Sequence, residues 1–163
     1  MVLQRKRPFY REVKPIPALP ALKCYLNRRP EADYHPYYQI QPNSTTWVGR
    51  HRQIMARQLV TVRELRRTAL SEIHRLACIL HDNIARPLSF YHTGNQFFVV
   101  QEYLYLDIFD LLPLSAMEVS CVMKQVTCGL QCLKEQSVMF GIDSIRVDFN
   151  GVVKIGQHAV STD

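Results

Sequence analysis

The fold of this chain is indicated by the stretch Phe97-Phe98-Val99-Val100-Gln101-Glu102-Tyr103-Leu104, in a sequence of 163 residues. Its first four residues are aromatic or β-branched, which favours a buried strand. A second apolar run covers residues 84–91, and Thr93-Gly94-Asn95 lies between the two runs. Because a Gly-Asn pair favours the tight turn between antiparallel strands, this region predicts a β-hairpin.

Further elements are expected on both sides of this hairpin. Upstream, short strands are expected over residues 37–60, and apolar residues recur at three- and four-residue steps over residues 62–80. That spacing predicts an amphipathic helix, with Glu72 on or beside its apolar face. Downstream, the same spacing predicts a longer helix over residues 116–136, followed by a second hairpin around Asn150-Gly151. The order of the elements predicts an α+β fold.

This order resembles that of a eukaryotic protein kinase, over about residues 37–159. Ser71-Glu72-Ile73 is similar to the family's regulatory helix, and His81-Asp82-Asn83-Ile84 is similar to the turn before its fourth strand. Residues 99–104 resemble the fifth strand and hinge, and Gly151-Val152-Val153-Lys154-Ile155 resembles the strand that leads into Asp-Phe-Gly. The resemblance implies a protein kinase-like N-lobe, made of an antiparallel sheet and a regulatory helix, with an incomplete helical C-lobe.

The resemblance also divides the chain. Residues 1–36 are basic and rich in proline, a composition that resists both helix and central strand, and we expect an extended arm there. The N-lobe is expected over about residues 37–104 and the start of the C-lobe over about residues 105–159. Residues 160–163 form a tail that ends before any segment that would bind a peptide substrate.

A degenerate nucleotide cleft is the site that the resemblance implies. Arg57 falls where the family has its phosphate-binding Lys, although a shift of one residue would put Gln58 there. A guanidinium is a poor substitute for a compact ammonium at that position, but Arg57 can form an ion pair with Glu72. The gatekeeper and the residues beside the adenine are expected to be Gln101, Glu102 and Leu104.

The residues that phosphoryl transfer needs are mostly replaced. The family uses a Gly-rich loop, a substrate-orienting Asp and metal-binding Asn and Asp residues. Here residues 42–47 read Pro-Asn-Ser-Thr-Thr-Trp, Ser144 replaces the Asn, and Gln157-His158-Ala159 replaces Asp-Phe-Gly. The shortened catalytic loop argues against Asp143 as a substitute base. We therefore expect no catalytic residue, no metal site and no cofactor, and any ATP binding should be weak and independent of magnesium.

Composition restricts the class of protein further. Hydrophobic residues make up 47% of the chain and charged residues 21%, which is typical of globular proteins. No run reaches the ~20 apolar residues of a membrane span, and no signal peptide is evident, so we expect an intracellular protein, cytoplasmic or nuclear. The five cysteines are odd in number and predict buried apolar residues rather than disulfides. The net charge of +6 is spread along the chain, which indicates a solvated basic surface.

The function that the sequence favours is that of a pseudokinase, a catalytically inactive kinase-like domain that acts as a protein-binding or regulatory module. Its expected partner is another protein, such as an active kinase, or a second copy of the chain. We do not expect it to bind a membrane. Two alternatives stay open. One is a truncated or incomplete Ser/Thr-type protein kinase that binds ATP and transfers phosphate. The other is a basic nucleic-acid-binding module, which would bind oligonucleotides with a steep salt dependence.

Overall fold

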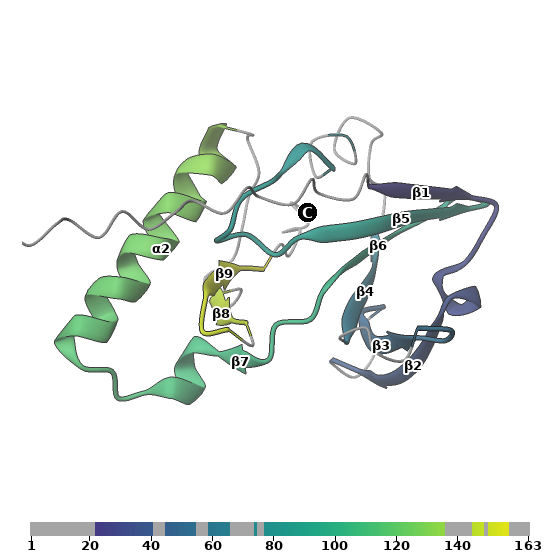
Figure 1. Cartoon of the computed structure of the whole chain (residues 1–163). Helices are drawn as coiled ribbons and strands as arrows, with labels where there is room; N and C mark the ends of the chain where they lie inside the picture. Colours follow the sequence, from purple (N-terminus) through teal and green to yellow (C-terminus); the bar gives the residue numbers. More distant parts are fainter. Residues whose placement is uncertain are drawn as a thin grey trace, which may run out of the picture.

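The computed structural model describes residues 22–40, 45–54, 59–65, 74, 77–135, 145–148 and 150–156. Within these ranges the fold is mixed α+β, with a six-stranded sheet, a three-stranded sheet and one helix of 20 residues (Figure 1). The elements are, in chain order, β1 (Lys23–Leu26), η1 (Pro30–Ala32), β2 (Tyr34–Gln39), β3 (Trp47–His51), β4 (Val60–Leu65), β5 (Pro87–Thr93), β6 (Gln96–Glu102), β7 (Leu106–Asp107), η2 (Ile108–Leu111), α2 (Ala116–Glu135), β8 (Ile145–Val147) and β9 (Val153–Ile155).

The opening stretch of the sequence forms β6, an interior strand of the large sheet. The strand order is β1-β5-β6-β4-β3-β2, and β6 pairs antiparallel with both β4 and β5. Phe98, Val99, Val100 and Gln101 are all buried, because both faces of β6 are covered. A strand that is covered on both faces needs a nearly continuous apolar run, and this explains the sequence pattern.

Alternate side chains of the large sheet enter two separate cores. Val99 and Phe90 pack on one face with Leu133 of α2 and Ile155 of β9. Val100 belongs to the other core, where it is packed with tyrosines and strand residues. This division follows from the two-residue period of a strand, which sends neighbouring side chains to opposite faces. The sheet therefore separates an α2-facing side from a side that α2 does not cover.

The three-stranded sheet has the order β7-β8-β9 and lies beside α2 (Figure 1). Backbone hydrogen bonds tie β9 to the segment before β5: the Ile155 amide donates to the Asn83 carbonyl at 2.9 Å, and the Ala85 amide donates to the Ile155 carbonyl at 2.9 Å. The Asn83 side-chain amide donates to the Val153 carbonyl at 2.9 Å and to Gln125 of α2 at 3.1 Å. These contacts fix the small sheet against both α2 and the large sheet.

Both predicted hairpins and the longer helix are confirmed. β5 and β6 are joined through Gly94, which has a φ of 56°, and β8 and β9 are joined through Gly151, which has a φ of 77°. Positive φ is the conformation that glycine adopts without steric cost. The helix predicted over residues 116–136 is α2, which spans Ala116–Glu135.

The start of the first predicted helix is wrong. A helix was expected from residue 62, but residues 60–65 form β4, which pairs with β3 and β6. Val60, Thr61 and Val62 are β-branched and extend the apolar run that begins at Leu59, a composition that favours a strand. His74, Ala77 and Cys78 are helical, whereas residues 66–73 lie outside the described part of the chain.

The last part of the predicted arm pairs with the large sheet. β1 runs parallel to β5 at one edge, and β2 pairs antiparallel with β3 at the other edge. Pro36 is tolerated in β2 because one side of an edge strand has no neighbouring strand, so no backbone N–H has to donate a hydrogen bond there. A register shift between β2 and β3 occurs between Pro36 and Tyr38. Pro30 begins η1 and is buried, whereas residues 1–21, which hold the remaining four arm prolines, are outside the described ranges.

Candidate functional site

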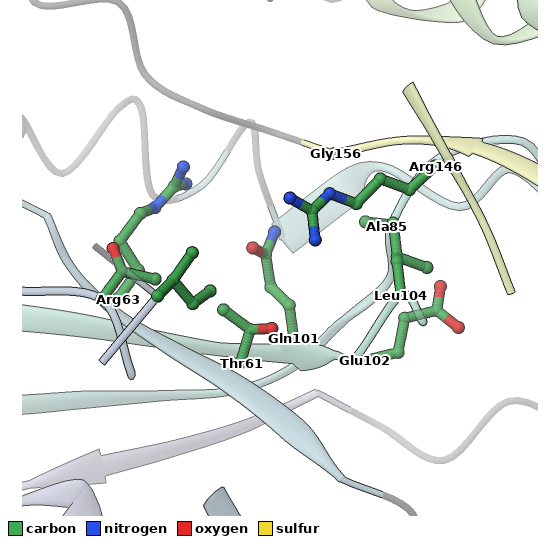
Figure 2. A pocket seen from close by; sticks show the side chains of 10 residues that line it. Thr61, Arg63, Ala85, Gln101, Glu102, Leu104, Arg146 and Gly156 are labelled. Carbon is green, nitrogen blue, oxygen red and sulfur yellow. The ribbon is translucent and has the colours of Figure 1, made fainter. Parts of the chain in front are cut away.

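A narrow cleft lies where the large sheet meets the segment 103–105 and the three-stranded sheet (Figure 2). Its walls come from β4, β6, β8 and the connections around them. Ten of the described residues line it: Ile40, Thr46, Thr61, Arg63, Ala85, Gln101, Glu102, Leu104, Arg146 and Gly156.

The register between β4 and β6 directs polar side chains into this cleft. Thr61 lies opposite Gln101, and Arg63 lies opposite Val99. Since side chains alternate between faces, these residues share the α2-facing side of the sheet. Arg63 is only 8% exposed and Gln101 only 6%, so a cation and an amide are buried at positions that carry apolar residues elsewhere in the same strands.

The connection after β6 closes one end of the cleft. Leu104 is buried there, and the Tyr103 hydroxyl forms a hydrogen bond of 2.8 Å with the Tyr38 hydroxyl. Burial, and then this hydrogen bond, raise the pKa of Tyr103 to about 12, so the phenol stays neutral near neutral pH. The pair links the connection to β2 at the edge of the large sheet.

Arg146 enters the cleft from the opposite wall. It lies on β8 across from Asp107 of β7, and its guanidinium is 3.8 Å from the Asp107 carboxylate. Figure 2 shows the Arg146 guanidinium and the Gln101 amide pointing into the same space. A volume of about 50 Å³ remains open between the lining side chains. This is far below the ~300–1,000 Å³ of pockets that hold drug-sized ligands.

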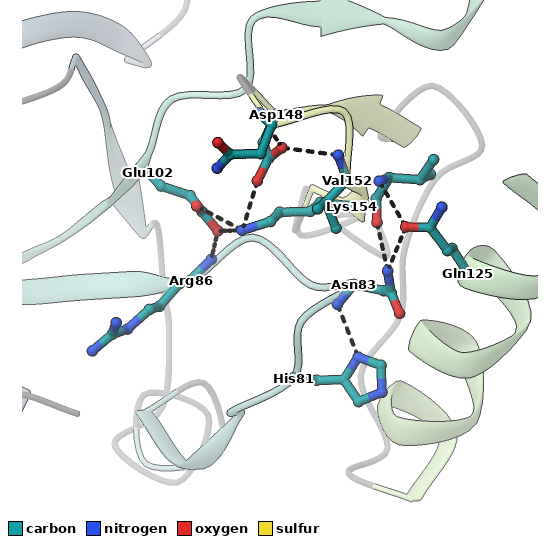
Figure 3. Close-up of polar contacts among 10 residues, drawn as sticks. His81, Asn83, Arg86, Glu102, Gln125, Asp148, Val152 and Lys154 are labelled. Carbon is teal, nitrogen blue, oxygen red and sulfur yellow. Dashed lines mark hydrogen bonds and ion pairs between the residues drawn. The ribbon is translucent and has the colours of Figure 1, made fainter. Parts of the chain in front are cut away.

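An ion-pair cluster lies beside the cleft (Figure 3). The Lys154 ammonium donates to both carboxylate oxygens of Glu102 at 2.8 Å and lies 3.5 Å from the Asp148 carboxylate. Glu102 also accepts the Arg86 backbone amide at 2.7 Å, while Asp148 accepts the Asn150 amide at 2.8 Å and the Val152 amide at 2.9 Å. The Lys154 side chain is 13% exposed and that of Glu102 is 22% exposed, so the pair is largely shielded from water.

The lining residues offer charge but little proton-transfer chemistry. The guanidinium groups of Arg63 and Arg146 cannot be deprotonated in a protein, and the Gln101 amide does not titrate. Among the described lining residues, the only carboxylate belongs to Glu102, and it already accepts hydrogen bonds from Lys154 and Arg86. A general base needs a free acceptor within hydrogen-bond reach of its substrate. This arrangement suits the binding of an anion better than acid–base catalysis.

Three of the predicted site residues meet in the cleft. Gln101, Glu102 and Leu104 line it together. Arg57 and the alternative Gln58 lie outside the described residues, as does Glu72, so the predicted ion pair between Arg57 and Glu72 stays a prediction. The replaced catalytic positions, residues 143–144 and 157–159, are outside the described ranges too.

Arg63, Arg146 and Lys154 were not predicted as site residues. A signal for Arg63 was present, because Val60-Thr61-Val62-Arg63 continues a β-branched run in which a strand would place Thr61 and Arg63 on one face. Arg146 pairs with Asp107 and Lys154 with Glu102, partners that are 39 and 52 residues away in the chain, and no local pattern indicates these pairs.

Other predicted features can be compared with the described residues only. Among these, no group of three or more His, Cys, Asp or Glu residues is arranged to hold a metal ion. No described helix is long and apolar enough to cross a membrane. The five cysteines are all free thiols, and four of them are exposed, which contradicts the prediction of buried apolar residues. The exposed positions of Cys121 and Cys128 follow from their place on the side of α2 that faces away from the sheets.

Comparison with protein families found none that matches the chain, and comparison with curated proteins found no matching sequence.

Proposed function

We propose that this chain is a catalytically inactive, kinase-like module of the cell interior that acts by binding another protein. The order of strands, hairpins and long helix agrees with the order that the resemblance implies. The predicted gatekeeper Gln101 and the predicted hinge residues Glu102 and Leu104 line one cleft. Fold alone does not determine activity, so the proposal rests on what fills that cleft.

The observation that carries the proposal is the filled cleft. Arg63 and Gln101 from the large sheet and Arg146 from β8 occupy the space between the two sheets, and about 50 Å³ stays open. A nucleotide could enter only if these side chains moved. A divalent cation beside the triphosphate would also have to bind near two guanidinium groups, which repel it. The cleft therefore favours a regulatory role over phosphoryl transfer.

Magnesium is expected to leave the affinity for ATP unchanged. The chain should be titrated with ATP in the presence and absence of magnesium by isothermal calorimetry, and an active kinase should be titrated as a positive control. Any weak binding should be lost in Arg63→Met, because phosphate oxygens would be held by that guanidinium. A tenfold or larger gain in affinity with magnesium would instead support the active-kinase alternative.

An exposed apolar surface supports the protein-binding part of the proposal. Of 14 large hydrophobic residues that are exposed in the described ranges, eight fall within residues 105–123. We call this the η2–α2 surface, and it consists of Tyr105, Leu106, Phe109, Leu111, Leu112, Met117, Val119 and Met123. Aromatic residues and methionines are enriched in protein interfaces, so a stretch of the chain that exposes this many apolar side chains is a candidate for contact with a partner.

Self-association through the η2–α2 surface is expected in a purified sample. Phe109 is 60% exposed and Met117 is 78% exposed, so replacing both with glutamate should leave the fold intact. Met117 lies in the first turn of α2, where a negative charge is favourable. Size-exclusion chromatography with light scattering should show a mass above the monomer for the wild type and a monomer for the double variant.

Leu26→Glu is the matched control for this experiment. Leu26 is 75% exposed but lies at the end of β1, outside the η2–α2 surface. The control should associate like the wild type. A wild-type chain that is monomeric and melts cooperatively at high concentration would argue against self-association. If Leu26→Glu abolished self-association as well, the effect would not be specific to the η2–α2 surface.

A further inference from the structure

A second, larger cavity lies on the side of the large sheet that α2 does not cover. Its volume is about 770 Å³, within the ~300–1,000 Å³ range of small-molecule pockets. Tyr91 lines it and belongs to the core on that side, whereas its neighbour Phe90 packs in the α2-facing core. We call it the tyrosine cavity, and it is separate from the cleft, although Glu102 borders both.

One wall of the tyrosine cavity is aromatic. The Tyr25 and Tyr91 rings are stacked with centroids 4.7 Å apart, and the Tyr34 ring meets Tyr91 edge-on at 6.5 Å. The Tyr91 hydroxyl donates to Asp33 at 2.8 Å, and burial with this hydrogen bond raises the pKa of Tyr91, so it stays a neutral donor. Arg28 forms an ion pair with Asp33, and its guanidinium lies 5.4 Å from the centre of the Tyr25 ring. These polar groups are therefore already satisfied.

Other polar groups in the same lining have no described partner. Ser89 is 4% exposed, and its hydroxyl oxygen is buried without a hydrogen bond from or to any described residue. The Nε atom of Arg86 is likewise buried and unpaired within the described part of the chain. Both atoms have almost no accessible surface, so a molecule in the cavity would contact Arg86 through its terminal nitrogens rather than through these two atoms.

The charges around the cavity point to an anion. Lys23 lies directly across from Ser89 in the register of β1 and β5. The ion pairs among the described residues include none with the side chain of Lys23 or Arg86. The carboxylates of Asp33 and Glu102, which also line the cavity, pair with Arg28 and Lys154. Figure 3 shows the Arg86 guanidinium pointing away from Lys154. Lys23 and Arg86 thus supply two cations to the lining of the tyrosine cavity.

We propose that the tyrosine cavity binds a small organic anion with a planar ring. Its carboxylate or phosphate group accepts hydrogen bonds from the terminal nitrogens of Arg86 and is attracted by Lys23. Its ring contacts the Tyr25 and Tyr91 wall, since aromatic rings favour stacked or edge-on contact with other rings. This inference does not depend on the proposed function, because none of the residues that it uses fills the cleft.

Phenyl phosphate and benzoate are suitable probes for the full-length chain. Phenol tests the contribution of the charge, and inorganic phosphate tests that of the ring. Dissociation constants are measured by NMR titration. Phenyl phosphate or benzoate should bind at least tenfold more tightly than phenol or inorganic phosphate, and binding should weaken as salt is added.

Two variants locate the bound probe. Ser89→Ala removes only a buried hydroxyl that has no partner among the described residues and does not open into the cavity, so both the fold and the affinity should be kept. Arg86→Met should lower affinity by tenfold or more. Arg146→Met, which removes a cation from the cleft instead, should change it less than twofold. The proposal would be overturned if neither anion bound at 10 mM, or if phenol bound as tightly as the anions. It would also be overturned if Arg146→Met lowered the affinity as much as Arg86→Met does.

Discussion

Gly129→Leu is expected to unfold the chain or to lower its free energy of unfolding by about 3 kcal/mol or more, because α2 touches the backbone before β5 at this residue. A Cβ atom on Gly129 would lie 2.8 Å from the Asn83 carbonyl oxygen and 2.9 Å from Ile155 Cδ1. The Ile155 side chain can rotate away. The Asn83 carbonyl cannot, because it accepts the Ile155 amide at 2.9 Å and holds β9 in place.

Gly129→Ala sets helix propensity against the close contact. In an exposed helix, an alanine would stabilise the helix by about 1 kcal/mol relative to glycine. Here the clash outweighs this gain, and a net loss of about 1–2 kcal/mol is expected. Cys128→Leu is the control, because it places the same leucine side chain at an exposed neighbour on α2. Urea unfolding followed by circular dichroism measures all three variants, and a stabilised Gly129→Ala would show that α2 does not pack this closely.

Lys154→Met is expected to lower the free energy of unfolding by about 2–3 kcal/mol, because it leaves partly buried carboxylates without their cation. The Lys154 ammonium contacts both oxygens of Glu102 at 2.8 Å and lies near Asp148. Methionine keeps most of the length of the side chain, so the loss measures charge and hydrogen bonding rather than packing. Thermal and urea unfolding at neutral pH provide the measurement.

A double-mutant cycle isolates this interaction. Glu102→Gln removes the charge but keeps an oxygen that can accept the Arg86 amide. Combined with Lys154→Met, it should restore part of the lost stability, with a coupling energy of about 1–3 kcal/mol. Additive effects of the two substitutions would mean that the ion pair contributes nothing. Arg29→Met, at a position that has no ion pair among the described residues, serves as a charge-loss control and should change stability by less than about 0.5 kcal/mol.

The local parts of the fold could be predicted because short sequence patterns specify them. The turns of both hairpins contain a residue with positive φ, Gly94 in one and Gly151 in the other. Glycine adopts this conformation readily, so its presence marks both turns in the sequence. Twenty residues of periodic apolar pattern were enough to predict α2. The strand β4 was missed because its last residues also fit the spacing of the helix expected after it, and only pairing with β6 decides between the two.

By itself, the sequence determined that β6 is a buried strand and that two hairpins and one long helix surround it. Only the tertiary structure decided that Arg63 and Arg146 fill the cleft, that Lys154 neutralises Glu102 across 52 residues, and that a tyrosine cavity opens on the other face. The physical reason is that turn geometry and apolar periodicity act over a few residues. Ion pairs and cavities depend instead on strand register and on contacts between distant segments.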